Sequence, residues 1–99
     1  MRFLVTATPK FPAPPDQIIA LIDRAEQWQE RYSDRLEVFG LFPGGGGFAI
    51  ADVPDEATLH RMMVEMPFTP FTHVDVRAFV DGETGWRQAR EAIGAMMQA

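Results

Sequence analysis

The order in which strand-like and helix-like segments alternate restricts the fold of this chain more than any other feature. Four segments rich in β-branched and aromatic residues predict strands, at residues 2–8, 36–42, 48–53 and 72–80. Between and after them, apolar residues recur at steps of three and four, which is typical of helices. The order strand, helix, strand, strand, helix, strand predicts an α+β fold of the ferredoxin-like βαββαβ type, with an extra C-terminal helix. We expect one domain spanning residues 1–99.

Each predicted helix has a start or stop signal in the sequence. The first begins near Asp16, after a proline-rich connection, and is expected to end near Ser33. The second follows Pro54-Asp55 and is stopped by Pro67. The last is expected to be capped by Thr84. Its apolar stripe comprises Trp86, Ala89, Ile93, Met96 and Met97, with Arg90 beside it.

This topology leaves one face of the sheet without a helix. Right-handed crossovers place both main helices on the same face. In the last strand, Val74, Val76 and Ala78 should then pack under the helices, and His73, Asp75 and Arg77 should face the opposite way. A bare sheet face needs a cover, and the same face of a second chain supplies it economically. The sequence therefore predicts a homodimer or a higher homo-oligomer.

Composition excludes several classes of function. The chain has no cysteine, so disulfides and thiolate chemistry are absent. A net charge of -5 argues against nucleic acid as a partner. No stretch approaches the ~20 apolar residues of a membrane helix, so we expect a cytoplasmic protein with no membrane partner. Two distant histidines without cysteine predict no metal site.

Two groups of side chains are candidates for binding and catalysis. Trp28 and Tyr32 lie one turn apart on the first helix, where an aromatic pair could hold a flat ligand or simply belong to the core. His73, Asp75 and Arg77 share one strand face. That row could act as a proton-transfer group, its orienting carboxylate and an anion clamp, or it could be a salt-bridge row at a dimer seam.

The hairpin tip contains four consecutive glycines, Gly44–Gly47, of which a simple hairpin needs one or two. The others would suit the close approach of a ligand or a partner backbone, with N–H groups facing an anion. The alternative is a mobile tip. No G-x-x-x-x-G-K-[ST] pattern is present, which excludes a nucleotide-binding loop of that type.

The segment Ala51–Val76 resembles the second half of the muconolactone δ-isomerase family. The matching motifs are Asp52-Val53-Pro54, Thr58-Leu59-His60 and Pro67-Phe68-Thr69-Pro70-Phe71, and Lys10-Phe11-Pro12 matches the K-L-P that follows the family's first strand. The resemblance implies a dimeric α/β barrel, in which two sheets face each other. It also implies a cofactor-free 1,3-proton shift on a small lactone carboxylate, with Lys10 as a cation beside the developing enolate. The hairpin departs from the family, which carries polar and aromatic residues, including a histidine, in place of the glycines.

From these observations we predict a cofactor-free isomerase or cyclase that acts on a small cyclic lactone or polyketide-like compound. The predicted catalytic residues are Lys10, Tyr32 and His73. The predicted substrate-binding residues are Trp28, Gly45, Gly46 and Arg77. No cofactor or metal is expected. The alternatives are a non-catalytic ligand-binding or interaction protein of the same fold and, third, a cofactor-independent monooxygenase.

Overall fold

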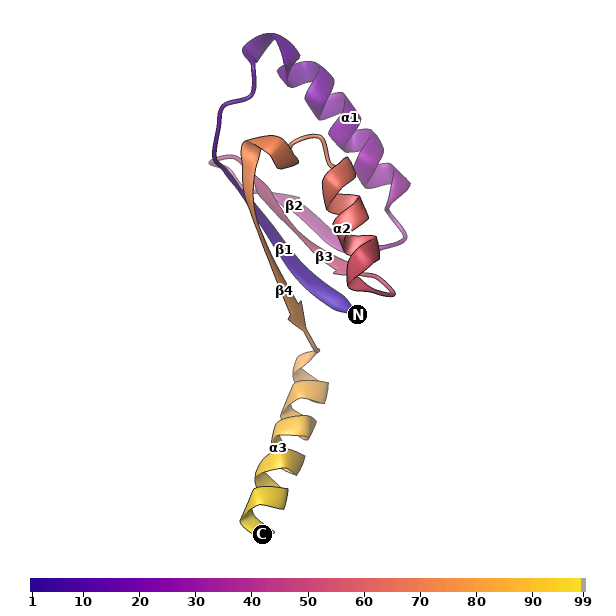
Figure 1. The fold of residues 1–99 in the computed structure, drawn as a ribbon, viewed down its shortest axis with the longest axis vertical. Coiled ribbons are helices and arrows are strands. Elements are labelled where there is room, and N and C mark those ends of the chain that lie inside the picture. The colour runs from indigo at the N-terminus through magenta and orange to yellow at the C-terminus, as the bar shows by residue number, and fades with distance from the viewer. Residues whose placement is uncertain (99) are drawn as a thin grey trace.

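The computed structural model describes residues 1–98 (Figure 1). The strands are β1 (Arg2–Pro9), β2 (Leu36–Leu41), β3 (Gly47–Asp52) and β4 (Thr72–Phe79), and the helices are α1 (Ile18–Arg31), α2 (Glu56–Glu65) and α3 (Gly82–Gln98). Two 3-10 turns, η1 (Pro15–Gln17) and η2 (Thr69–Phe71), precede α1 and β4. All strand pairs are antiparallel, in the order β2-β3-β1-β4. This is the predicted ferredoxin-like arrangement.

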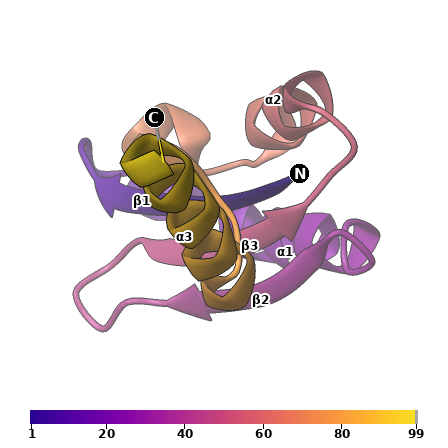
Figure 2. The same cartoon turned by 90° about the horizontal axis from the view of Figure 1, so that it is seen from below.

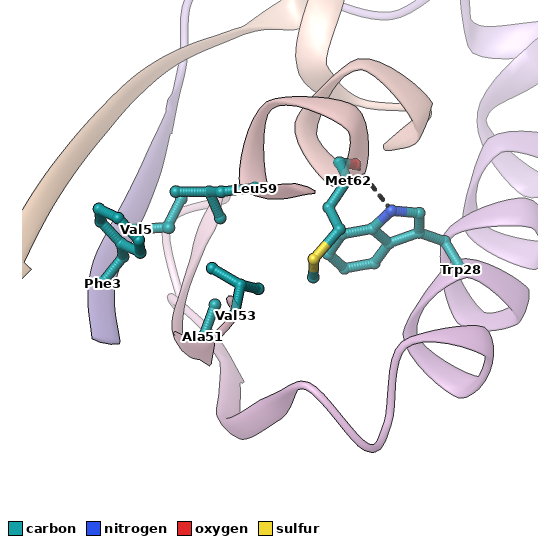
Figure 3. Packing of buried hydrophobic residues seen from close by; sticks show 7 residues of the cluster. All are labelled: Phe3, Val5, Trp28, Ala51, Val53, Leu59 and Met62. Atoms are coloured by element: carbon teal, nitrogen blue, oxygen red, sulfur yellow. Dashed lines mark hydrogen bonds between the residues drawn. The ribbon is translucent and has the colours of Figure 1, made fainter. Parts of the chain in front are cut away.

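The core lies between the sheet and the two helices α1 and α2. Phe3 and Val5 from β1 meet Trp28 of α1 and Leu59 and Met62 of α2 (Figure 3). The Trp28 Nε1–H donates a 2.9 Å hydrogen bond to the Met62 carbonyl oxygen, so the indole joins both helices through a polar contact as well as through packing. A buried indole N–H needs such a partner.

The ends of the helices follow from local hydrogen bonds. α1 ends at Arg31, two residues before the predicted end. The Tyr32 N–H still donates to the Trp28 carbonyl, and the Arg35 and Leu36 N–H groups then bond to the Tyr32 carbonyl, which turns the chain into β2. α2 is capped by Asp55, whose side chain accepts from the Thr58 N–H at 2.8 Å.

The predicted alternation of β4 is confirmed, although its cover is incomplete. Val76 pairs with the buried Val5 and therefore faces the helical side, together with Val74 and Ala78. Val76 is nevertheless 44% exposed, so the expectation that this row packs under the helices holds only in part. The reason is positional: β4 is an edge strand, and the helical layer does not extend fully over it.

The opposite face of the sheet carries no helix in the described part of the chain, as the topology predicts. Leu4 of β1 and Val38 of β2 are exposed on it. Arg2 bridges the face, since its guanidinium is 2.5 Å from the Glu37 carboxylate and 4.9 Å from the centre of the Phe79 ring. The second copy that we expect over this face is still a prediction.

α3 extends away from the rest of the molecule (Figures 1 and 2), and gives it dimensions of 64 × 25 × 22 Å. Its N-cap is Asp81 and not Thr84: the Asp81 carboxylate accepts from the Thr84 N–H at 3.1 Å and from the Thr84 hydroxyl at 2.7 Å. The prediction was wrong because the threonine supports the cap from the third helical position. Among the described residues of α3, none is buried.

Candidate functional site

A cavity of about 440 Å³ opens between the sheet, α1 and η2, at the end of the sheet where the hairpin tip lies. This volume suits a small ligand. The lining comes from β1, the connection to α1, the hairpin and the segment around η2. It consists of Val5, Ala7, Pro9, Phe11, Pro12, Ala13, Ile22, Trp28, Phe39, Leu41, Phe42, Gly45, Gly46, Gly47, Phe48, Ala49, Met63, Met66, Phe68, Thr69, Phe71, Thr72 and Val74.

Seven aromatic side chains contribute to the wall of this cavity. Phe42 and Phe48 stack at 5.7 Å between ring centres, and Phe11 stands exposed at the mouth. The polar side chains of the lining are Thr69 and Thr72. The Thr69 hydroxyl donates to the Met63 carbonyl at 2.7 Å, and the Thr72 hydroxyl donates to the Phe68 carbonyl at 3.2 Å. Their lone pairs are thus free to accept, whereas their protons are already used.

The glycine tip forms one wall of the cavity. Gly45 and Gly46 have φ angles of +103° and +79°, which favour glycine. A side chain on Gly46 would place its Cβ 2.1 Å from the Ala7 carbonyl oxygen, so the tip packs directly against β1. The Gly45 N–H donates to the Phe42 carbonyl at 3.0 Å, and is therefore not available to an anion. Close packing explains these two glycines better than a mobile tip.

Lys10 lies at the rim of the cavity, between the lining residues Pro9 and Phe11. Its N–H donates to the Phe71 carbonyl at 2.9 Å, which fixes the backbone of this connection against η2. Its ammonium is 5.3 Å from the centre of the Phe11 ring. The side chain is exposed and does not belong to the lining itself.

Tyr32 lies beside Trp28 but outside the cavity. The two rings meet edge to face at 5.7 Å. The Tyr32 hydroxyl donates to the Glu65 carboxylate of α2, which the Arg31 guanidinium approaches at 3.6 Å. The hydrogen bond to Glu65 raises the pKa of Tyr32 above its ordinary value. Tyr32 therefore links the C-terminal ends of α1 and α2.

His73 and Arg77 lie on the open face of the sheet, away from the cavity. The predicted row exists, because His73, Asp75 and Arg77 share that face, and His73 Nε2 is 3.7 Å from Asp75 Oδ2. All three side chains are exposed in the single chain. The predicted site residues thus lie in four places. Trp28, Gly45 and Gly46 line the cavity, Lys10 lies at its rim, His73 and Arg77 lie on the opposite face of the sheet, and Tyr32 lies at the junction of the helices.

Sequence reasoning missed the phenylalanines that make this cavity aromatic. Phe11, Phe42, Phe68 and Phe71 all lie outside the regular helices and β-strands. Each has a proline next to it in the sequence, at Pro12, Pro43, Pro67 and Pro70. Proline stiffens a connection. Four phenylalanines on stiff connections were the signal that could have indicated an aromatic pocket.

Comparison with solved structures places the fold. A structure of muconolactone isomerase matches with a TM-score of 0.71, over 82% of this chain and 90% of that chain, at 21% identity. The chain has the muconolactone isomerase-like fold. The 5-chloro-2-hydroxyhydroquinone dehydrochlorinase of Burkholderia phenoliruptrix AC1100, in complex with 2,5-dihydroxybenzoquinone, matches with a TM-score of 0.67 over 85% of this chain and 98% of that chain, at 18% identity. No protein-family model and no curated protein sequence matches the chain.

Two further observations concern cofactors and membranes. Within residues 1–98, no three side chains of histidine, cysteine, aspartate or glutamate are grouped so that they could hold a metal ion. In the same part of the chain, no helix is long and apolar enough to cross a membrane.

Proposed function

We propose that the protein is a cofactor-free enzyme that takes a small ring compound of the lactone or quinone class into the cavity and moves a proton beside its carbonyl group. The observation that carries this proposal is the aromatic-lined cavity of about 440 Å³. The two structural neighbours named above are an isomerase of a lactone and a dehydrochlorinase of a hydroquinone, which supports the same class of substrate.

The aromatic walls would bind the ring and exclude water from it. Stacked or edge-on aromatic contacts add about 0.5–1.5 kcal/mol each beyond the area they bury. The lone pairs of Thr69 and Thr72 can accept a hydrogen bond from a ring hydroxyl. With most of its wall apolar, the cavity would favour a flat ring whose polar groups point toward the rim, where Lys10 lies.

Lys10 is the proposed electrostatic stabiliser. Removal of a proton beside a carbonyl builds negative charge on the carbonyl oxygen, and a cation nearby lowers the free energy of that state. The lysine ammonium stands on a flexible four-carbon stem at the rim, so it can turn from the Phe11 ring toward a bound oxyanion or carboxylate. Because Tyr32 and His73 both lie outside the cavity, water at its open side would take up the proton.

Solvent isotope exchange tests this proposal. We would incubate the protein in heavy water with a muconolactone-type lactone carboxylate or with 2,5-dihydroxybenzoquinone, and follow exchange at the carbon next to the carbonyl by NMR. Lys10→Ala should lower the exchange rate by roughly a hundredfold or more. Lys10→Arg should keep part of the rate, and Arg24→Ala, on the exposed side of α1, is the matched control for lost charge.

A non-catalytic binding protein is the second candidate. It is favoured by the fact that no titratable side chain belongs to the cavity lining in the described part of the chain. The readout is tryptophan fluorescence in a Trp86→Phe variant, which retains Trp28. Saturable quenching by the ring compound, with no isotope exchange in any variant, would support this candidate over the enzyme. Absence of both binding and exchange would exclude this class of ligand for the cavity.

A further inference from the structure

A second cavity of about 440 Å³ lies on the helical face of the sheet, between α2 and the edge strand β4. α2 contributes Leu59, His60 and Met63 to its wall, and Val74 and Val76 of β4 form its floor. We call this space the α2–β4 groove. It is as large as the aromatic-lined cavity, but the binding of a single ring makes no use of it.

The two cavities meet at Met63 and Val74. Among the described residues, these two are common to both linings. Val74 belongs to the sheet and Met63 to α2, so one lies on the floor of the junction and the other above it. Both side chains are partly buried and pack against the core. The Met63 side chain therefore separates the aromatic-lined cavity from the α2–β4 groove.

Met63 can change its side-chain conformation without moving its backbone. Its carbonyl accepts a 2.7 Å hydrogen bond from the Thr69 hydroxyl and a 3.3 Å bond from the Met66 N–H, which hold the C-terminal end of α2 in place. Methionine is unbranched, has three rotatable bonds and adapts its shape to irregular spaces. Valine is β-branched and its χ1 angle is restricted, so Val74 is a fixed floor. Of the two residues at the junction, Met63 is thus the one that can open it.

The linings of the two cavities differ in chemistry. Seven aromatic residues line the first, whereas the α2–β4 groove is mainly aliphatic, with Leu59, Val74 and Val76 among its residues. Its polar side chains, Glu56 and His60, are exposed at the surface of α2. The first cavity therefore suits a flat ring, and the groove suits an aliphatic chain. Their combined volume lies in the upper part of the range of ligand sites, about 300–1,000 Å³.

We infer that Met63 turns aside to join the two cavities into one channel under α2, and that the ligand is a ring compound with an unbranched alkyl side chain. The ring lies in the aromatic-lined cavity, and the chain passes between Met63 and Val74 and ends in the groove over Val76. Met63 thereby determines specificity for the side chain of the ligand. This inference rests on the proposed function, because the same cavity receives the ring.

A pair of homologous quinones tests the channel. The probes are the 3-methyl and 3-hexyl homologues of 2,5-dihydroxybenzoquinone, the quinone in the structure of the dehydrochlorinase neighbour. Each methylene that an aliphatic wall encloses strengthens binding about threefold. The methyl group stays with the ring, whereas the hexyl chain reaches past Met63. In calorimetric titrations, we expect the hexyl homologue to bind roughly thirtyfold or more tightly than the methyl homologue, since part of its chain stays in contact with water.

Substitutions of Met63 should change this ratio of affinities. Met63→Ile keeps a similar volume but is stiff at χ1, so the partition stays closed and the ratio should fall to about threefold or less. Met63→Ala removes the partition and should keep the ratio. Met66 lines the aromatic-lined cavity but not the groove, so Met66→Ile is the matched control. It should change the affinity for both homologues by the same factor. Circular dichroism verifies that each variant is folded.

Methyl NMR of the natural chain locates the alkyl chain without any substitution. Ala49 lines the aromatic-lined cavity alone and Val76 lines the groove alone, so both homologues should shift the Ala49 signal and the hexyl homologue should also shift Val76. A hexyl homologue that shifts Ala49 but not Val76, or an unchanged ratio in Met63→Ile, would overturn the inference and leave the proposed binding of a ring intact. If neither homologue shifted Ala49, the proposed function would fail, and the inference would fail with it.

Discussion

α1 and α3 are both amphipathic helices with a tryptophan on the apolar stripe, yet they have opposite environments. In α1, Trp28 is 3% exposed and is hydrogen-bonded to α2, whereas in α3, Trp86 is 75% exposed. The difference arises from connection and not from pattern: α1 returns over the sheet through a crossover, and α3 leaves the end of β4. Periodicity therefore specifies which side of a helix is apolar, but not whether the fold covers that side.

The largest contrast should come from truncating the two tryptophans. Trp28→Ala removes the centre of the core and leaves the Met62 carbonyl without its donor, so the free energy of unfolding should fall by about 3–5 kcal/mol. Trp86→Ala, measured where the protein is monomeric, should change it by no more than about 0.5 kcal/mol. Urea unfolding followed by circular dichroism measures both.

The same two variants can contradict this contrast between a buried α1 and an exposed α3. A loss of several kcal/mol in monomeric Trp86→Ala would mean that α3 packs against its own body in solution. In that case the stripe that is exposed in this structure would be covered within one chain.

The sequence predicted the body of the fold well because its signals are local. The alternation in β4 and the turn chemistry of Pro43 and the glycines determine register and hairpin without reference to distant contacts. The incomplete cover of Val76 was not predictable in this way. It depends on how far the helical layer reaches across the sheet, which is a property of the packed helices.

The candidate site was predicted less well because distant segments meet there. Trp28, Gly45 and Gly46, which were predicted to bind substrate, line the cavity, and their role in binding is still a prediction. Lys10 and Tyr32 were both predicted to be catalytic, but Lys10 lies at the rim of the cavity and Tyr32 joins α1 to α2. The directions of those two side chains depend on tertiary contacts, with Phe11 and with Glu65, that no spacing along the chain reveals.

Alanine substitutions at two glycines, one in the hairpin and one in α3, should change stability in opposite directions. Gly46→Ala, in the body, forces a methyl group onto the Ala7 carbonyl at a φ of +79°, so it should lower the free energy of unfolding by more than about 1 kcal/mol. Gly94→Ala, in α3, meets open space and should raise helix stability by about 1 kcal/mol. Thermal unfolding reports the first, and amide hydrogen exchange in α3 reports the second. A neutral Gly46→Ala would contradict the packed hairpin tip.

Tyr32 provides a test of the connection that α1 has and α3 lacks. The chain contains a single tyrosine, so its absorbance can be titrated without interference. The hydrogen bond to Glu65 raises the pKa of Tyr32, and Glu65→Gln should therefore lower that pKa toward the ordinary value. Because the folded-state pKa is raised, the stabilising contribution is complete below about pH 10 and is lost as the pH rises through the folded pKa. An unchanged titration curve in Glu65→Gln would exclude the hydrogen bond.

The smallest expected effect concerns the N-caps of α2 and α3, which have the same sequence pattern. α2 packs against the sheet, whereas α3 extends away from it. Asp55 caps α2 and Asp81 caps α3, and each carboxylate accepts bonds from the N–H and hydroxyl of the threonine three residues later. These bonds favour the charged form and lower the pKa of both aspartates. A lowered folded-state pKa means that the stabilising contribution is present above the unfolded pKa of about 3.9 and is lost as the pH falls through the folded value.

Protonation of Asp55 at α2 and of Asp81 at α3 should have different consequences. Asparagine keeps a cap without titrating, so Asp55→Asn should flatten the fall in global unfolding free energy below about pH 4. Asp81→Asn should leave that global profile unchanged, because α3 rests on no part of its own core, and should instead alter only the pH dependence of amide exchange in α3. If both variants flattened the global profile equally, α3 would unfold cooperatively with the sheet, α1 and α2. The distinction between α3 and the rest of the fold would then be wrong.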